Sequence, residues 1–251
     1  MNSTVASTGD IPALDHDEAM AIAEVEYSRL LDTVDCLEPA DWARPTDCAG
    51  WDVKAVIAHL VGMMELLADP AEFGRQVSVA AERAAASGAH RIDVLTALQV
   101  EEHVHLTTDA LVAALRHLVP AALAGRGGTT AEDRAAVYTP GPPFDGDWTR
   151  GYLLDIIHTR DPWLHRIDIG RATSRDIAWT PAHDGRIVAD VVADWARRHG
   201  QPFTLVLHGP AGGRFAGSSG GESYELDAVE FCRILSGRAA GSGLLNQLVP
   251  F

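Results

Sequence analysis

Apolar residues recur at helical spacing through most of the first 175 positions of the chain. Asp52 precedes one of these runs and is suited to cap its helix. Residues 70–90, alanine-rich after Pro70, are ambiguous and predict a short helix and a loop. Residues 125–151 are rich in Gly and Pro and predict a long loop of the kind that covers pockets. The apolar periodicity predicts long helices at about residues 16–37, 53–69, 93–124 and 150–173.

The pattern changes after Ser174. A helical run at about 184–199 is followed by short strand-like runs and a last short helix, capped by Asp227. The predicted strand positions are residues 202–209, Phe215 and residues 223–226. We therefore expect a mainly α protein, with an N-terminal four-helix bundle at residues 13–175 and a small α/β (α+β) domain at residues 176–251. Residues 1–12, rich in Ser, Thr and Gly, predict a frayed tail.

Composition narrows the class of protein. The 251 residues are 47% hydrophobic, which allows substantial cores, and no run of about 18 apolar residues predicts a membrane span. The formal charge of −15 argues against a nucleic-acid partner, which would require a clustered basic surface. Cys36, Cys48 and Cys232 are too few and too scattered for a disulfide framework. We expect a cytoplasmic monomer or homodimer that acts on small molecules.

Three aspartates and two histidines lie close together between positions 155 and 168. On an α-helix, four of them fall within an arc of roughly 80°, and Asp155 lies about 60° outside it. Pro162 lies inside this helix and is expected to distort the preceding turn and so to displace Asp161. The four aligned residues are His158, Asp161, His165 and Asp168.

A stripe of imidazoles and carboxylates suits either a metal ion or an ion-pair network. Residues four apart on a helix project together, so Asp161 and His165 can share one ion. His59, at the rim of the apolar face of its helix, is the best-placed third ligand, although it also fits a core histidine bonded to a carbonyl. In the metal interpretation, His158 and Asp168 orient the ligands. Spacing equally allows a surface salt-bridge stripe with Arg160 and Arg166, or a purely structural one.

Three segments resemble the mycothiol-dependent maleylpyruvate isomerase family of actinobacteria. They are residues 48–60 (CAGWDVKAVIAHL), 159–172 (TRDPWLHRIDIGRA) and 230–238 (EFCRILSGR). The resemblance implies a DinB-like four-helix metal-binding domain joined to a small α/β domain related to sterol-carrier proteins. It implies zinc held by His59, Asp161 and His165. The isomerase has glutamate where this chain has Asp161, which shortens the carboxylate arm by one methylene.

The resemblance also implies a chemistry. Zinc would lower the pKa of the sulfur of mycothiol, a low-molecular-weight thiol, so that the thiolate isomerises or conjugates a small electrophile. An arginine of the small domain would hold a substrate carboxylate; Arg238 is the better match and Arg233 the other candidate. Residues 125–151 would limit the access of water. The alternative is a noncatalytic metal- or ligand-binding regulator on the same fold.

Overall fold

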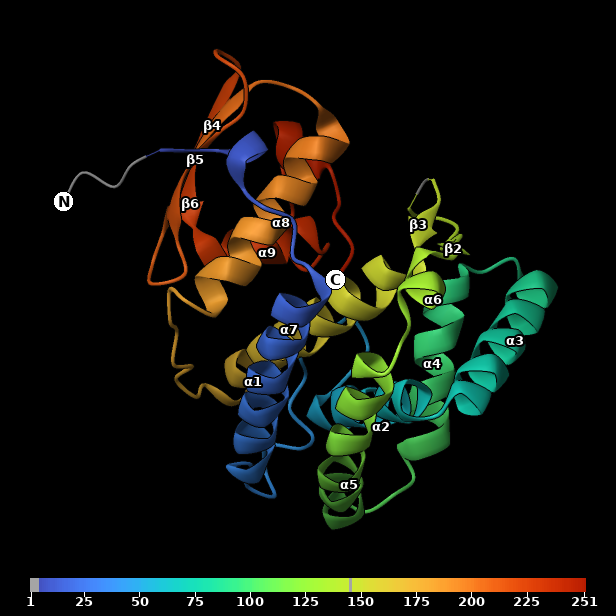
Figure 1. Cartoon of the computed structure of the whole chain (residues 1–251). Coiled ribbons are helices and arrows are strands. Elements are labelled where there is room, and N and C mark those ends of the chain that lie inside the picture. Colours follow the sequence, from blue (N-terminus) through green and yellow to red (C-terminus); the bar gives the residue numbers. More distant parts are fainter. Residues whose placement is uncertain (1–4, 145) are drawn as a thin grey trace. The chain divides into compact units, whose positions relative to one another are not determined.

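The structure is a computed structural model that describes residues 5–144 and 146–251. The chain forms two compact units (Figure 1). One comprises His16–Asp176, and the other joins the described residues up to Asp15 to Ile177–Phe251. The first unit is helical and the second combines helices with a small sheet, so the predicted mainly α fold is confirmed.

The helical unit is built around α2 (Val53–Ala68), which packs against α3, α4, α5 and α7. Because α2 is apolar on nearly every side, it belongs in the interior, and 13 of its 16 residues are buried. Asp52 caps it by accepting a hydrogen bond from the Ala55 amide at 2.8 Å, as the sequence predicted. The surrounding elements are α1 (His16–Asp35), α3 (Pro70–Ser87), α4 (Arg91–His103), α5 (Thr108–Gly127), α6 (Ala131–Ala135), a π-helix (Tyr152–Ile157) and α7 (His158–Thr173).

The prediction for residues 70–90 was wrong, because this segment forms one long helix, α3. Asp69 caps it by accepting a hydrogen bond from the Ala71 amide, and Pro70 occupies its first turn. Gly88, at φ 72°, ends it in the left-handed conformation that glycine adopts without strain. The pattern of Asp, Pro and a distant Gly was therefore a helix signal in the sequence.

The single helix predicted at residues 93–124 is in fact two helices, bent by 118° to each other. Thr107 breaks the run by accepting a hydrogen bond from the Ala110 amide at 3.2 Å, as the cap of α5. The bend lets both α4 and α5 pack against α2. By length and composition, no single described helix is suited to cross a membrane, and only the bent α4–α5 pair together meets such a criterion.

Residues 125–151 contain short structured elements instead of a simple loop. After α6, strands β2 (Val137–Tyr138) and β3 (Trp148–Thr149) pair as an antiparallel hairpin. The Trp148 ring contacts Tyr138, Phe144 and Tyr152, with ring centroids 5.1–6.2 Å apart. Aromatic contacts therefore hold this hairpin.

The second unit contains a four-stranded sheet in the order β1-β5-β4-β6. Helices α8 (Asp184–His199) and α9 (Ala228–Leu235) lie on one face of it (Figure 1). Phe203, Leu205 and Leu207 alternate inward from β4, and Trp195 of α8 packs 4.7 Å from the Phe203 ring. The strands are β1 (Ala6–Ser7), β4 (Phe203–His208), β5 (Gly213–Ala216) and β6 (Glu222–Asp227).

The predicted frayed tail is wrong for residues 6–10. Ala6 and Ser7 form β1, which pairs in parallel with Phe215 and Ala216 of β5. Thr8 donates a side-chain hydrogen bond to the Ala216 carbonyl at 3.3 Å. Strand β5 thus supplies hydrogen-bond partners for the backbone of Ala6 and Ser7. The composition of this polar segment does not indicate such partners.

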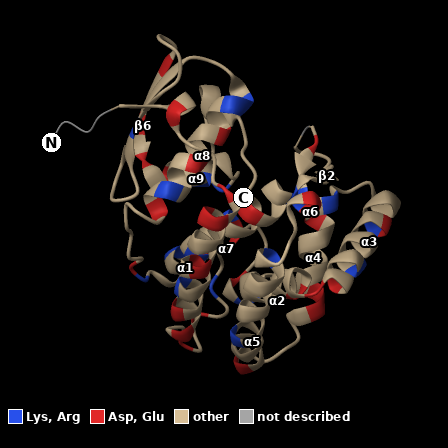
Figure 2. Ribbon diagram, in the orientation of Figure 1, with Lys and Arg blue, Asp and Glu red and all other residues tan. Residues whose placement is uncertain are grey.

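Charged side chains of both signs are interspersed along the helices, for example on α1 and α3 (Figure 2). On α3, Arg75 pairs with Glu72 and also with Glu102 of α4, at 2.5 and 2.6 Å. Arg83 pairs with Glu101 at 2.7 Å. These pairs use Glu101 and Glu102 of α4 as cross-helix partners of α3.

Candidate metal centre

Two histidines and an aspartate from two helices meet inside the helical unit. His59 lies on α2, and Asp161 and His165 lie four residues apart on α7, which packs against α2. His59 Nε2 is 3.3 Å from one carboxylate oxygen of Asp161, and His165 Nε2 is 3.3 Å from the other. The two imidazole centroids are 5.0 Å apart. The structure thus brings together the three residues that were predicted as ligands.

The donor atoms suit a first-row divalent metal ion. Zinc binds imidazole nitrogen and carboxylate oxygen, and in a tetrahedral site with bonds of about 2.0–2.1 Å the neighbouring ligand atoms are about 3.3–3.4 Å apart. Each imidazole Nε2 lies at this separation from one of the two Asp161 oxygens, and one ligand atom from each of the three residues can be chosen within 4.8 Å of the others. Asp161 keeps 18% of its side-chain surface exposed, so the group is open on one side, as a catalytic site requires.

A carboxylate fixes the orientation of His165. Its Nδ1 lies 3.0 Å from Asp168 Oδ2, and Asp168 is fully buried. Cys48 donates its thiol proton to the same oxygen at 3.3 Å. Because Nδ1 faces Asp168, Nε2 is directed toward Asp161. Asp168 therefore lies where the sequence predicted a supporting residue, and Cys48 is a second support that the sequence did not identify.

An amide chain fixes the orientation of His59. Its Nδ1 lies 2.7 Å from Oε1 of Gln99 on α4, and Gln99 Nε2 donates to Oε1 of Gln76 on α3 at 2.9 Å. Gln76 in turn donates to the Gly62 carbonyl at 3.0 Å. A side chain at Gly62 would place its Cβ 2.7 Å from the Gln99 side chain, so this approach requires glycine. His59 therefore contacts the buried amide carbonyl of Gln99 through Nδ1, as the core-histidine interpretation expected, while its Nε2 faces Asp161 as the ligand interpretation requires.

Sequence reasoning missed Gln99 and Gln76. Both are almost completely buried, at 2% and 0% exposure, in helices whose other buried positions are few. A glutamine at a core position is a weak signal of a buried polar network, because such groups are retained when they are hydrogen-bonded. The sequence predicted neither the full length of α3 nor the break between α4 and α5. The side of its helix on which each glutamine lies was therefore not recognised.

The neighbouring charges of the cluster shift the pKa values of Asp161 and His165 in opposite directions. Burial would raise the pKa of Asp161, but the neighbouring His165 and His59 hold that pKa well below its usual value. Burial would lower the pKa of His165, but Asp161 and Asp168 raise it well above its usual value. Both shifts favour the charged forms of Asp161 and His165 when no metal ion is bound, and a metal ion that bound His165 at Nε2 would compete with a proton there.

A second set of donor atoms shares His165. Ligand atoms of Cys48, His165 and Asp168 also lie within 4.8 Å of one another. This set takes the Nδ1 side of the ring, where Asp168 already forms its hydrogen bond and where Cys48 Sγ lies 3.9 Å away. The two sets use opposite sides of one imidazole. In the set with His59, both imidazoles have their other nitrogen held by a buried side chain, which favours it as the centre.

His158 makes a contact that differs from the expected one. Its Nε2 is buried without a hydrogen-bond partner among the described residues, and burial together with Arg126 lowers its pKa to about 3. Its backbone carbonyl accepts hydrogen bonds from the Tyr27 hydroxyl at 2.8 Å and from Arg126 at 3.2 Å. Pro162, four residues later, has no N–H to offer that carbonyl. Tyr27 and Arg126 thus complete the helix where the proline interrupts it.

The remaining members of the stripe are paired elsewhere in the helical unit. Asp155 lies in the π-helix and contacts His16 of α1 at 3.0 Å. Arg166 binds the buried Glu26 of α1 through two nitrogens, at 2.6 and 3.0 Å. The stripe is therefore largely buried and is not a solvated row of surface salt bridges.

Arg238 lies in the other unit, just after α9. Its backbone N–H donates to the Arg233 carbonyl at 2.9 Å, in the turn that follows the helix. Arg233 is buried and forms a close ion pair with Glu230. A role for Arg238 in binding a substrate carboxylate stays a prediction.

Comparisons with known proteins identify the family. A family model described as the mycothiol maleylpyruvate isomerase N-terminal domain matches residues 23–170. This match covers more than half of the chain, which therefore belongs to this enzyme family. None of the curated proteins compared matches the sequence.

Two solved structures have a similar fold. One is the crystal structure of the mycothiol-dependent maleylpyruvate isomerase, which is 16% identical, with a TM-score of 0.59, over 95% of this chain and 94% of that chain. The other is a single-residue mutant of that enzyme, which is 15% identical, with a TM-score of 0.61, over 94% of this chain and 93% of that chain. At these identities the similarity establishes the fold of both units.

Proposed function

We propose that this family member is a zinc-dependent enzyme that uses mycothiol to isomerise or conjugate a small electrophile. The observation that carries the proposal is the geometry of Asp161, whose two oxygens lie 3.3 Å from Nε2 of His59 and of His165. Family membership supports the thiol-dependent isomerase class. When bound, a zinc ion would lower the pKa of the thiol and so supply a thiolate near neutral pH.

Several residues of the chain have defined parts in this proposal. His59, Asp161 and His165 would hold the ion, while Gln99 and Asp168 keep both imidazoles in one tautomer and one orientation. Cys48 would not be the nucleophile, because its thiol proton is engaged with Asp168 on the far side of the His165 ring.

Asp161 is one methylene shorter than the glutamate at the same position of the isomerase. Its carboxylate lies 3.3 Å from both imidazoles, which supports the proposal that an aspartate would serve here without the extra methylene of glutamate. The turn before it is completed by Tyr27 and Arg126, which fix the His158 carbonyl. We expect this anchored turn to set the position of Asp161 relative to His59.

The proposal is tested first by metal content. Wild-type protein purified without a histidine tag should contain about one zinc ion per chain by elemental analysis. His59→Ala and His165→Ala should lose most of it, whereas His208→Ala, an exposed histidine of the other unit, should not. Absence of metal from the wild type, or wild-type metal content in both ligand variants, would overturn the site.

The activity is tested with mycothiol and a panel of electrophiles that includes a cis-enedioate such as maleylpyruvate. Isomerisation is expected with the cis-enedioate, or consumption of mycothiol with an electrophile that retains the thiol. Turnover should require both the metal and the three ligands. A zinc-loaded protein that turns over no member of the panel would favour the noncatalytic binding role on the same fold.

A further inference from the structure

Three side chains on the far side of the His165 ring form a second donor set of sulfur, nitrogen and oxygen. Cys48 Sγ lies 3.3 Å from Asp168 Oδ2 and 3.9 Å from His165 Nδ1, and the last two atoms lie 3.0 Å apart. A tetrahedral ion of the size of zinc, bound by these three kinds of atom, would space them about 3.4–3.6 Å apart. Shifts of about 0.4 Å or less would therefore close the three atoms around one ion.

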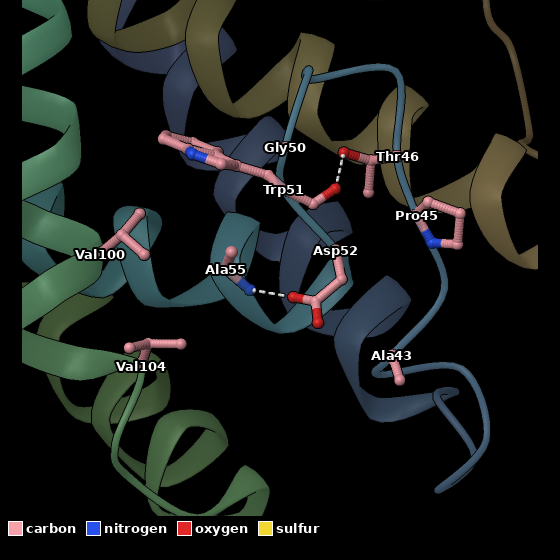
Figure 3. Close-up of a pocket in the computed structure, with 9 residues that line it drawn as sticks. All are labelled: Ala43, Pro45, Thr46, Gly50, Trp51, Asp52, Ala55, Val100 and Val104. Carbon is pink, nitrogen blue, oxygen red and sulfur yellow. Dashed lines mark hydrogen bonds between the residues drawn. The ribbon is translucent and has the colours of Figure 1, made fainter.

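The loop before α2 holds the sulfur in place. The Thr46 hydroxyl donates to the Trp51 carbonyl at 2.9 Å, as Figure 3 shows, and accepts from the Cys48 amide at 3.2 Å. Asp47 accepts a hydrogen bond at 2.7 Å from Arg171 of α7, the helix that carries the other two donors. Because the loop is tied both to itself and to α7, the donor set is preformed, which reduces the cost of binding an ion.

The sulfur is the donor that an ion from solvent meets first. Cys48 is half-buried, whereas His165 and Asp168 are 4% and 0% exposed. The two inner donors are therefore shielded from water, and the thiol lies at the entrance to them.

The sulfur also decides which ions this set prefers. Thiolate is a soft ligand that selects thiophilic metal ions, while imidazole and carboxylate accept harder ones. The set of His59, Asp161 and His165 contains no sulfur. A thiophilic ion is therefore expected to favour the Cys48 side of the His165 ring.

We propose that Cys48, His165 and Asp168 form a second metal site, which takes thiophilic ions such as cadmium(II) or copper(I) and inactivates the zinc centre. Only the inactivation rests on the proposed function. The ion replaces the thiol proton of Cys48, which leaves to water, and takes the lone pair of His165 Nδ1. A neutral imidazole has one lone pair, so the remaining ring proton then lies on Nε2. His165 can then no longer bind zinc beside His59 and Asp161, and the two sites exclude each other.

The first test titrates cadmium(II) into the reduced, metal-free full chain and follows the ultraviolet band of a cadmium–thiolate bond. The wild type should gain this band with about one cadmium ion per chain. Cys48→Ala should lose the band, whereas Cys36→Ala, which removes an exposed cysteine after α1, should keep it. Asp161→Asn, which removes a proposed zinc ligand outside this set, should also keep it.

The second test adds cadmium(II) to the zinc-loaded chain and counts the bound ions by native mass spectrometry. About one zinc ion should leave for each cadmium ion that binds. Cys48→Ala should require about tenfold more cadmium or more, at least the scale for loss of a residue that only supports a ligand. Cys36→Ala should exchange its zinc as the wild type does.

Three results would overturn the second site. They are the absence of the band from the wild type, a band that persists in Cys48→Ala, and zinc and cadmium bound together in one chain. If Asp161→Asn loses zinc but no cadmium band forms, the second site is wrong and the proposed function stands. If the band depends on Cys48 but the wild type binds no zinc, the second site stands and the proposed function is wrong.

Discussion

Gln99 provides a sharp test of the proposed metal centre, because its contact with the three proposed ligands is the hydrogen bond with His59. The Gln99→Met variant keeps nearly the same side-chain length but removes two hydrogen bonds, with His59 Nδ1 at 2.7 Å and Gln76 Oε1 at 2.9 Å. His59 and Gln76, which lose these hydrogen bonds, are 3% and 0% exposed, so water does not replace the lost contacts. The His59 ring is then free to rotate or to change tautomer.

The expected magnitudes follow from that loss. Each buried group left unpaired costs about 1–3 kcal/mol, so the free energy of unfolding should fall by roughly 2–6 kcal/mol. Loss of a residue that orients a metal ligand typically weakens metal binding about 10–100-fold, or about 1.4–2.7 kcal/mol. Zinc affinity is measured by competition with a chromophoric chelator at fixed pH, and stability by urea unfolding of the metal-free protein.

Two further variants serve as controls for Gln99→Met. Gln99→Glu keeps an oxygen facing His59 Nδ1, so its zinc affinity should stay within about threefold of wild type on the scale of a retained supporting contact. Leu98→Met alters the neighbouring buried position with little change of volume and should leave zinc affinity unchanged. Wild-type zinc affinity in folded Gln99→Met would refute the assignment of His59 as a ligand held by this amide chain.

Three further outcomes are expected. In the metal-free protein, the raised pKa of His165 means that its stabilising charge is complete below about pH 6.5 and is lost as the pH rises through the folded-state pKa. Urea unfolding should therefore show lower stability at pH 9 than at pH 6.5, with the difference removed in His165→Gln. Tyr27→Phe should lower the unfolding free energy by about 1–3 kcal/mol, because the His158 carbonyl and Arg126 both lose a buried partner, whereas Tyr138→Phe should be nearly neutral by thermal unfolding. Cys48→Ala should retain zinc by native mass spectrometry; loss of the metal would transfer the centre to the Cys48 set.

The sequence alone determined the parts of this protein that depend on local geometry. Residues four apart project from the same side of any α-helix, so the pairing of Asp161 with His165 follows from spacing. The cap at Asp52 and the buried character of α2 also follow from short-range patterns. The mainly α fold with a small α/β part, predicted from these runs, is confirmed.

Local sequence patterns predicted the wrong secondary structure where contacts between distant segments determine it. A continuous apolar periodicity spans α4 and α5, yet packing both helices on α2 requires the bend at Thr107. Residues 6–10 join a sheet whose other strands lie about 200 positions later, so no local signal marks them as ordered.

Only the tertiary structure decided which side chains support the centre. Gln99 and Cys48 are far from His59 and Asp168 in sequence, and contact them because helices and loops fold against one another. A hydrogen bond across such distances depends on the direction and depth of each side chain, which the spacing of residues in one helix does not encode. The sequence predicted His59, Asp161 and His165 as ligands, whereas the packing of α2 on α7, and of α3 and α4 on α2, decided that Gln99 and Gln76 lie behind His59.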